Sequence, residues 1–151
     1  EAEAQAKAEA EAQAKAEAQK KAQQKSKGQK SKQYKEHMKR AQSAISRGKL
    51  SQALTHLQKA RKVRKSSKID KLYGVIYQKQ KNYQKAISAY RRSVRAWKRQ
   101  PGVWIDLGQC YYKKKDYRNA KKSWVSGKKY AKGSQLAKIN KYIKLAEKKL
   151  N

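Results

Sequence analysis

The sequence predicts an all-α fold made of consecutive antiparallel helix pairs. From about Tyr34 onward, apolar residues recur at spacings of three and four, which is the period of an amphipathic helix. The chain also matches itself at a separation of 34 residues, where Gly74 aligns with Gly108 and Tyr83 aligns with Tyr117. A repeat of this length indicates an array in which neighbouring helix pairs bury each other's apolar faces.

Residues 1–33 are predicted to form a low-complexity helical extension or linker. The sequence EAEAQAKA at residues 1–8 recurs at 9–16, and all its residue types are good helix formers. Alanine at every second position makes no apolar stripe on a helix, so we interpret the segment as an exposed spacer, with a helix recruited by a partner as the alternative. Residues 20–33, where Gly28 and two serines lie among lysines, are expected to be a flexible junction.

Three helix pairs are predicted to follow, over residues 34–65, 67–99 and 101–133. In the second and third pairs, Asn82 and Asp116 stand where the second helix needs an N-cap. The first pair is a weaker copy that keeps mainly Ala53, Leu57 and Ala60 at the repeat positions. We expect this first pair to be looser than the others or to pack against the preceding segment.

Residues 134–151 are predicted to be a C-terminal capping helix. Their apolar stripe consists of Leu136, Ile139, Ile143, Ala146 and Leu150, with lysines on the opposite side. An array of helix pairs ends with an open apolar face, and a further amphipathic helix is the usual way to cover it.

The repeat positions resemble those of the tetratricopeptide repeat family, whose 34-residue unit alternates large residues with small ones at fixed positions. The third unit carries this pattern best, with Trp104, Leu107, Gly108, Tyr111, Ala120, Trp124 and Gly127. The second unit keeps most of it but has Asp70 at an aromatic position. The resemblance implies three antiparallel helix pairs in a right-handed superhelical stack, with the capping helix after it and the Ala-rich extension before it.

The charge of the chain is large and uneven. It has 42 basic and 10 acidic residues, a net charge of +32. Residues 1–20 contain five Glu and three Lys, so they carry −2 and leave +34 for residues 21–151. A surface this basic is expected to attract polyanions and acidic partners.

The residues that could carry chemistry are few and scattered. Cys110 is the only cysteine, so the chain cannot form an intrachain disulfide. The only histidines are His37 and His56, and these three residues do not have the spacing of a zinc site. Cys110 is expected to be a small buried hydrophobic residue of the third unit. No paired carboxylates and no phosphate-binding glycine loop are present. The sequence therefore predicts no enzyme, no catalytic residue, no metal, no cofactor and no small-molecule substrate.

The resemblance implies where a partner binds, because the first helix of each pair lines a concave groove in this family. Met38, Ile105 and Asp106 fall at groove positions together with a set of polar residues. That set is Lys35, Lys39, Gln42, Lys68, Lys71, Gln78, Lys79, Gln109, Tyr112 and Lys113. Lysines donate to carboxylates and glutamine amides to backbone groups, so the predicted function is an adaptor or scaffold that binds an acidic peptide segment or protein.

A subfamily of these proteins clamps a C-terminal carboxylate with lysine, arginine and asparagine side chains in the groove. This sequence resembles that subfamily only in its lysines, because the expected asparagine is replaced by Gln42, Val75 and Gln109. Recognition of a buried polar group tolerates little substitution, so a carboxylate clamp is not the expected binding mode.

Sequence-independent binding of nucleic acid, another anionic polymer or an anionic membrane surface is the alternative. Basic residues also occupy second helices, and the predicted polyanion patch is Arg91, Arg92, Arg95, Lys121 and Lys122. A third interpretation is that the charge has no binding role and belongs to a solvated surface that is rich in lysine because the whole proteome is. No run approaches the roughly 18 apolar residues of a membrane span. We expect a cytoplasmic location, and we interpret Glu1 as a processed or otherwise defined end, with room for an upstream segment.

Overall fold

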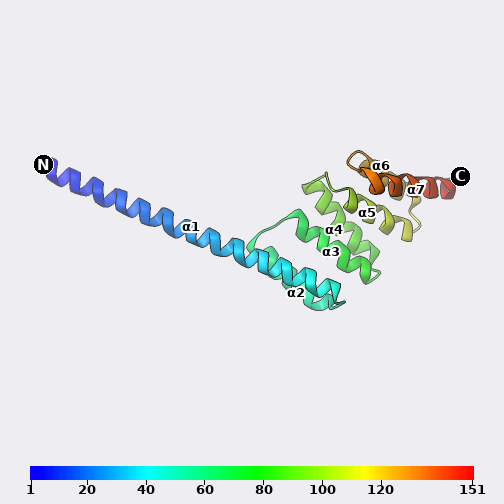
Figure 1. Ribbon diagram of the computed structural model, residues 1–151, viewed down its shortest axis with the longest axis horizontal. Helices are drawn as coiled ribbons and strands as arrows, with labels where there is room; N and C mark the ends of the chain where they lie inside the picture. Colours follow the sequence, from blue (N-terminus) through cyan, green and yellow to red (C-terminus); the bar gives the residue numbers. More distant parts are fainter.

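A computed structural model describes all 151 residues, which form seven α-helices and no strand. The helices are α1 (Ala2–Ser46), α2 (Leu50–Val63), α3 (Ser67–Lys79), α4 (Tyr83–Ala96), α5 (Pro101–Lys113), α6 (Tyr117–Lys128) and α7 (Gly133–Leu150). Helices α1 and α2, α3 and α4, and α5 and α6 follow one another as pairs, and the chain termini lie at opposite ends of the molecule (Figure 1). The all-α prediction is confirmed. None of the seven helices is both long and apolar enough to span a membrane.

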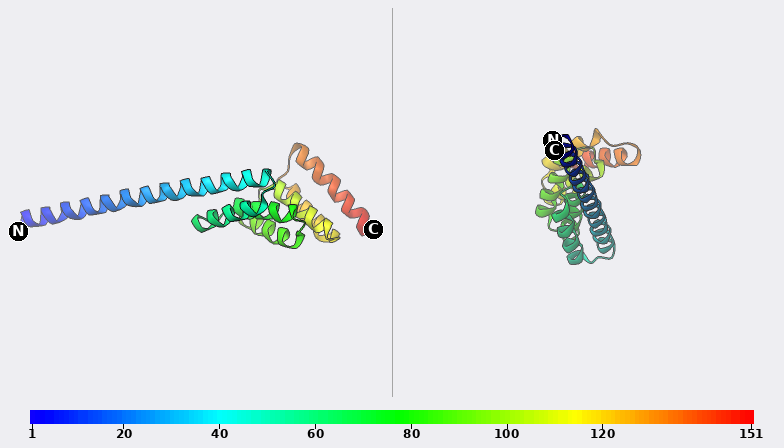
Figure 2. Two further views of the ribbon diagram at one scale, coloured as in Figure 1. Left: turned by 90° about the horizontal axis from the view of Figure 1, so that it is seen from below. Right: turned by 90° about the vertical axis from the view of Figure 1, so that its left-hand side faces the viewer.

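Helix α1 runs without interruption from the alanine-rich extension into the first helix pair. Its N-terminal part projects away from the other helices in Figure 1 and in the left view of Figure 2, and residues 1–33 are all exposed. The expected flexible junction at residues 20–33 is therefore wrong. One glycine costs an exposed helix only about 1 kcal/mol, and good helix formers flank Gly28 on both sides.

The turn inside each helix pair has the same backbone geometry. Gly48, Lys81 and Lys115 all adopt positive φ angles, of 72°, 59° and 62°. The next helices then begin at side-chain caps, as predicted: Asn82 Oδ1 accepts from Lys85 N at 3.2 Å, and Asp116 Oδ1 accepts from Asn119 N at 3.1 Å. The first pair has no such cap, and it has glycine at the strained position that lysine occupies in the other two.

The first helix pair is well packed, so the expectation of a looser unit is wrong. Ala53, Leu57 and Ala60 are fully buried in a cluster that joins α1, α2 and α3. Tyr34 lies at the edge of this cluster, where its hydroxyl forms a 2.7 Å hydrogen bond with Ser66 Oγ. Ser66 also caps α3, so Tyr34 ties α1 to the start of the second pair. The extension adds no buried residue to this cluster, because the residues before Tyr34 are exposed.

Helix α7 covers the end of the stack, where Ile139 and Ala146 are fully buried with Trp124 of α6 and Ile105 of α5. The predicted apolar stripe is correct for these two residues and for Leu136 and Ile143, which are half-buried and pack against the same cluster. Leu150 is 45% exposed, contrary to the prediction, because it is the last residue of the helix.

Candidate functional site

A pocket of about 420 Å³ opens between α3, α5 and α7, which are the first helices of the second and third pairs and the capping helix. We call it the first-helix groove. Its lining residues are Gln78, Lys79, Lys81, Tyr83, Gln109, Tyr112, Lys113, Trp124, Tyr142 and Leu145. They come from five helices and the α3–α4 turn, so only the folded stack brings them together.

Aromatic rings form the apolar part of the groove. The Trp124 ring lies 5.1 Å from the Tyr142 ring and 6.0 Å from the Tyr112 ring, measured between centroids. Leu145, which is 38% exposed, adds an aliphatic surface. Aromatic side chains give much contact area and lose little conformational entropy on binding, so this surface suits an apolar side chain of a partner.

Two glutamine amides are held in place within the groove. Gln109 Nε2 donates to the Tyr142 hydroxyl at 2.9 Å, and the Tyr90 hydroxyl donates to Gln78 Oε1 at 2.7 Å. The bond to Gln78 uses its Oε1 atom and leaves its Nε2 group free as a donor. The bond from Gln109 uses its Nε2 group and leaves its Oε1 atom free as an acceptor. The groove thus presents one donor and one acceptor, which is what a peptide group of a bound chain requires.

The rim of the groove is basic. Lys79, Lys81 and Lys113 are exposed and contribute its charged groups, and no acidic residue lines the groove. Lysine ammonium groups at such positions attract carboxylates and disfavour cationic ligands. The geometry therefore fits an apolar side chain flanked by acidic residues.

The structure brings together half of the predicted groove residues. Gln78, Lys79, Gln109, Tyr112 and Lys113 line the first-helix groove. The other half lie apart from it: Lys35, Lys39 and Gln42 on α1, and Lys68 and Lys71 on α3, are exposed. At a helical rise of 1.5 Å per residue, the two α3 lysines are about 10–15 Å along the helix from Gln78.

Two of the other positions assigned to the groove are in the core. Met38 is 8% exposed and belongs to the cluster of the first pair, and Ile105 is 5% exposed because α7 covers it. Asp106 lines a separate pocket near the start of α7, together with Ser134 and Lys138. Burial raises the pKa of Asp106 to about 6, against the opposing effect of Lys71 and Lys138.

Five lining residues of the groove were not predicted from the sequence. Lys81, Tyr83, Trp124, Tyr142 and Leu145 belong to turns, second helices or the capping helix, which were not assigned to the groove. Tyr142 carried a signal, since it lies three residues after the core residue Ile139 and therefore on a neighbouring part of the helix surface.

One known protein family has a sequence model that matches this chain. The family model described as tetratricopeptide repeat matches residues 38–101 and 74–124, which together cover more than half of the chain. The chain belongs to the tetratricopeptide repeat family. No curated protein matches it.

Several solved structures share the fold of this chain, and two of the three named here are tetratricopeptide repeat domains. It superimposes on pilF of Pseudomonas aeruginosa with a TM-score of 0.70 at 17% identity, over 80% of this chain and 55% of that one. The TPR2B domain of yeast Sti1, in complex with pHsp70, gives a TM-score of 0.70 at 12% identity, over 77% and 97%. The TPR domain of Arabidopsis OM64 gives 0.66 at 15% identity, over 80% and 96%. The chain thus spans about half the length of the pilF structure and nearly all of the two isolated domains.

The predicted polyanion patch of this tetratricopeptide repeat protein is divided by ion pairs. Arg92 Nε lies 3.1 Å from Asp70 Oδ1, and Lys121 Nζ lies 3.1 Å from Glu147 Oε1. Arg91, Arg95 and Lys122, the other three residues of the patch, make no salt bridge. Each of these three lines a second pocket.

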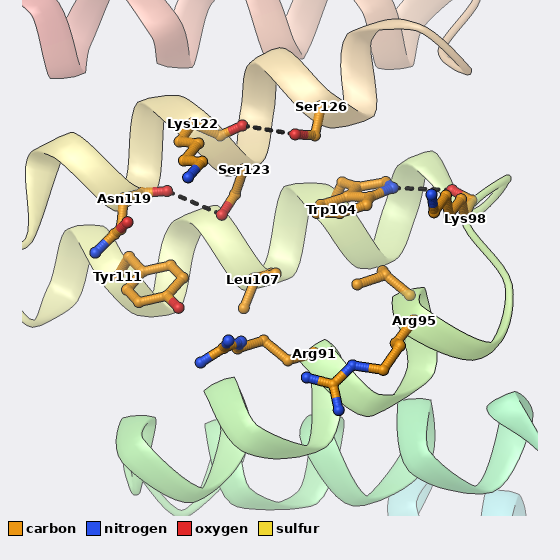
Figure 3. A pocket seen from close by; sticks show the side chains of 11 residues that line it. Arg91, Arg95, Lys98, Trp104, Leu107, Tyr111, Asn119, Lys122, Ser123 and Ser126 are labelled. Atoms are coloured by element: carbon orange, nitrogen blue, oxygen red, sulfur yellow. Dashed lines mark hydrogen bonds between the residues drawn. The ribbon is translucent and has the colours of Figure 1, made fainter.

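This second pocket, which we call the second-helix pocket, lies between α4, α5 and α6 and has a volume of about 420 Å³. Figure 3 shows the arginines on α4, the lysine on α6, and Trp104, Leu107 and Tyr111 on α5 between them. Its lining residues are Arg91, Val94, Arg95, Lys98, Trp104, Leu107, Tyr111, Asn119, Lys122, Ser123 and Ser126. Successive helical residues are about 100° apart, so Leu107 and Gln109 project from nearly opposite sides of α5. The two pockets are therefore separate.

Proposed function

We propose that this chain is a non-enzymatic adaptor or scaffold that binds an acidic polypeptide segment in the first-helix groove. The observation that carries the proposal is the composition of the groove, which has an aromatic floor, two oriented amides and a rim of lysines without any acid. The family consists of protein-interaction modules, and the similar Sti1 domain is in complex with pHsp70.

The proposed binding mode divides recognition among three kinds of contact. An apolar side chain of the ligand inserts into the groove against Tyr112, Tyr142 and Leu145, above the buried Trp124 ring. The free halves of Gln78 and Gln109 pair with a peptide group of the ligand. Carboxylates on either side meet the exposed lysines, and the positive field of the whole chain speeds encounter.

A fluorescein-labelled acidic hexapeptide, Glu-Asp-Leu-Glu-Asp-Glu, tests this mode by fluorescence anisotropy. The double variant Lys79→Glu and Lys113→Glu is expected to bind at least about tenfold more weakly, since each reversal replaces an attraction of a few tenths to 1 kcal/mol by repulsion. The control variant, Lys62→Glu with Lys128→Glu, changes the net charge equally on exposed sites of α2 and α6.

The control variant is expected to retain most of the affinity. An equal loss in both variants contradicts the groove and leaves only non-specific attraction. Replacing the leucine of the peptide by serine provides a second check, because unchanged affinity contradicts the insertion of an apolar side chain.

A second candidate function is the binding of nucleic acid or another anionic polymer. It is favoured by the net charge of +32 and by the unpaired basic side chains that line the second-helix pocket. Anisotropy with RNA and with single-stranded and duplex DNA, from about 50 to 300 mM salt, tests it, because phosphate contacts weaken by orders of magnitude over that range. Absence of binding at the lowest salt rejects this function.

A further inference from the structure

Four basic side chains converge on the second-helix pocket without an acidic neighbour. Arg91 and Arg95 are one turn apart on α4, Lys98 follows the end of that helix, and Lys122 faces them from α6 (Figure 3). None takes part in the three salt bridges of the protein, and no carboxylate lines the pocket. Like charges held around one cavity repel one another, so a bound anion relieves this repulsion. Two guanidinium groups also offer the planar fork that suits phosphate.

The floor between these cations is apolar and partly aromatic. Trp104, Leu107 and Tyr111 lie three and four residues apart on one side of α5, and Val94 closes the floor from α4. Trp104 is fixed in position, because its Nε1 donates to the Lys98 carbonyl at 2.9 Å and Gly127 leaves room for its side chain. A ligand in this pocket therefore needs a flat or apolar group next to its negative charge.

The pocket offers little to the backbone of a peptide. Ten of its eleven lining residues lie within helices α4, α5 and α6, whose backbone groups are paired along the helix. The hydroxyls of Ser123 and Ser126 donate to the carbonyls of Asn119 and Lys122, at 2.9 and 3.0 Å. The Asn119 amide donates to Asp116 Oδ2 at 2.8 Å, so the cationic groups and the ring faces are the main groups left for recognition, beside the Asn119 Oδ1 atom and the Tyr111 hydroxyl. Single-stranded nucleic acid is read through these two kinds of contact, phosphate pairing and base stacking.

We propose that the second-helix pocket binds a nucleotide unit of single-stranded nucleic acid. The phosphates pair with Arg91, Arg95 and Lys122, and the base lies on the half-buried rings of Trp104 and Tyr111, beneath which Leu107 is buried. The volume of about 420 Å³ is that of a small-ligand site, and a paired base stacked inside a duplex cannot enter it. This inference rests on the second candidate function and specifies its site and ligand, and it is independent of the peptide groove on the other side of α5.

Anisotropy with fluorescein-labelled single-stranded RNA and DNA hexamers of mixed sequence tests the proposal. The pocket variant carries Arg91→Gln, Arg95→Gln and Lys122→Gln, and the control carries Lys62→Gln, Lys128→Gln and Lys148→Gln, which are exposed and outside both pockets. At about 100 mM salt, the pocket variant is expected to lose at least tenfold in affinity and the control less than threefold. The plot of log K against log salt should become shallower by about 2 in the pocket variant, because each of the three lost phosphate contacts contributes about −0.7 to the slope for a single strand.

Both variants should give the circular dichroism spectrum and the urea unfolding midpoint of the unmodified protein, which shows that they are folded. If the wild-type protein binds no hexamer, the second candidate function fails. If it binds but the pocket and control variants lose affinity equally, the function stands and the pocket assignment fails.

Three further probes separate the ligand classes. A duplex of the same sequence is expected to bind more weakly than the single strand, and equal binding contradicts a base in the pocket. A glutamate hexamer should be insensitive to the pocket substitutions, and a matching loss would assign the pocket to an acidic polypeptide. A mononucleotide at the same phosphate concentration should displace the labelled hexamer poorly. Displacement as strong as that by an unlabelled hexamer would assign the second-helix pocket to a free nucleotide.

Discussion

Gly108→Ala perturbs the closest helix contact in the third repeat. A Cβ atom at this position would meet Nε1, Cδ1 and Cε2 of the Trp124 indole at distances that real Cβ atoms do not adopt. Trp124 is buried, and its Nε1 donates to the Ile105 carbonyl at 3.1 Å. The indole therefore has to shift, and this shift stretches or breaks that hydrogen bond.

The magnitude follows from three contributions. Overpacking by a single methyl group in a core costs about 1–3 kcal/mol. Loss of a partner for a buried N–H costs about 1–3 kcal/mol more. Alanine in place of glycine in a helix interior offsets about 1 kcal/mol. Gly108→Ala is therefore expected to lower the free energy of unfolding by about 1–5 kcal/mol.

Urea unfolding followed by circular dichroism and tryptophan fluorescence measures this free energy. Gly102→Ala is the matched control, because it lies in the same helix and the nearest atom to its Cβ is Gln135 Nε2 at 3.8 Å. We expect Gly102→Ala to be neutral or slightly stabilising. If Gly108→Ala unfolds at the same urea concentration as the unmodified protein, the close approach of Gly108 and Trp124 is wrong.

Two other substitutions test the polar contacts of the core. Burial raises the pKa of Asp106 from its ordinary value of 3.8 to about 6, so the folded protein binds a proton at this carboxyl more tightly than the unfolded chain does. The free energy of unfolding therefore falls as the pH rises from about 4 to 6. Asp106→Asn should raise the free energy of unfolding at pH 7.5 by at most about 3 kcal/mol, and urea curves at pH 4 should show little difference. Tyr34→Phe removes the hydrogen bond to Ser66 and should cost about 0.5–1.5 kcal/mol. Faster amide exchange at Ile69, whose N–H donates to Ser66 Oγ, is the expected local sign, and unchanged exchange contradicts the link between α1 and α3.

The repeat register could be predicted from the sequence because it depends on residue size at fixed spacing. Gly74 and Gly108 align at 34 residues, and each lies against a large ring, Tyr90 or Trp124, in the structure. The caps at Asn82 and Asp116 could be predicted for a similar reason, since a cap is a contact between residues three apart. Local chemistry decides both features.

The extent of α1 and the quality of the first repeat could not be predicted in the same way. Gly28 and its neighbours were expected to break the helix, but no competing tertiary contact draws this exposed segment into another conformation. The first repeat lacks most family residues, and Tyr34 and Met38 fill its core instead. The packing of a cluster depends on volumes contributed by several helices, which no single stretch of sequence contains.

The sequence by itself determined the helical class, the repeat length, the turn positions and the excess of positive charge, because each depends on residue types and spacings along one chain. Only the tertiary structure decided how that charge is distributed. Asp70 and Glu147 neutralise Arg92 and Lys121, while Arg91, Arg95 and Lys122 remain unpaired around one pocket. The packing of α7 likewise buries Ile105 and adds Tyr142 to the groove. Ion pairing and burial depend on distances between residues far apart in the chain, and those distances exist only after the helices have packed.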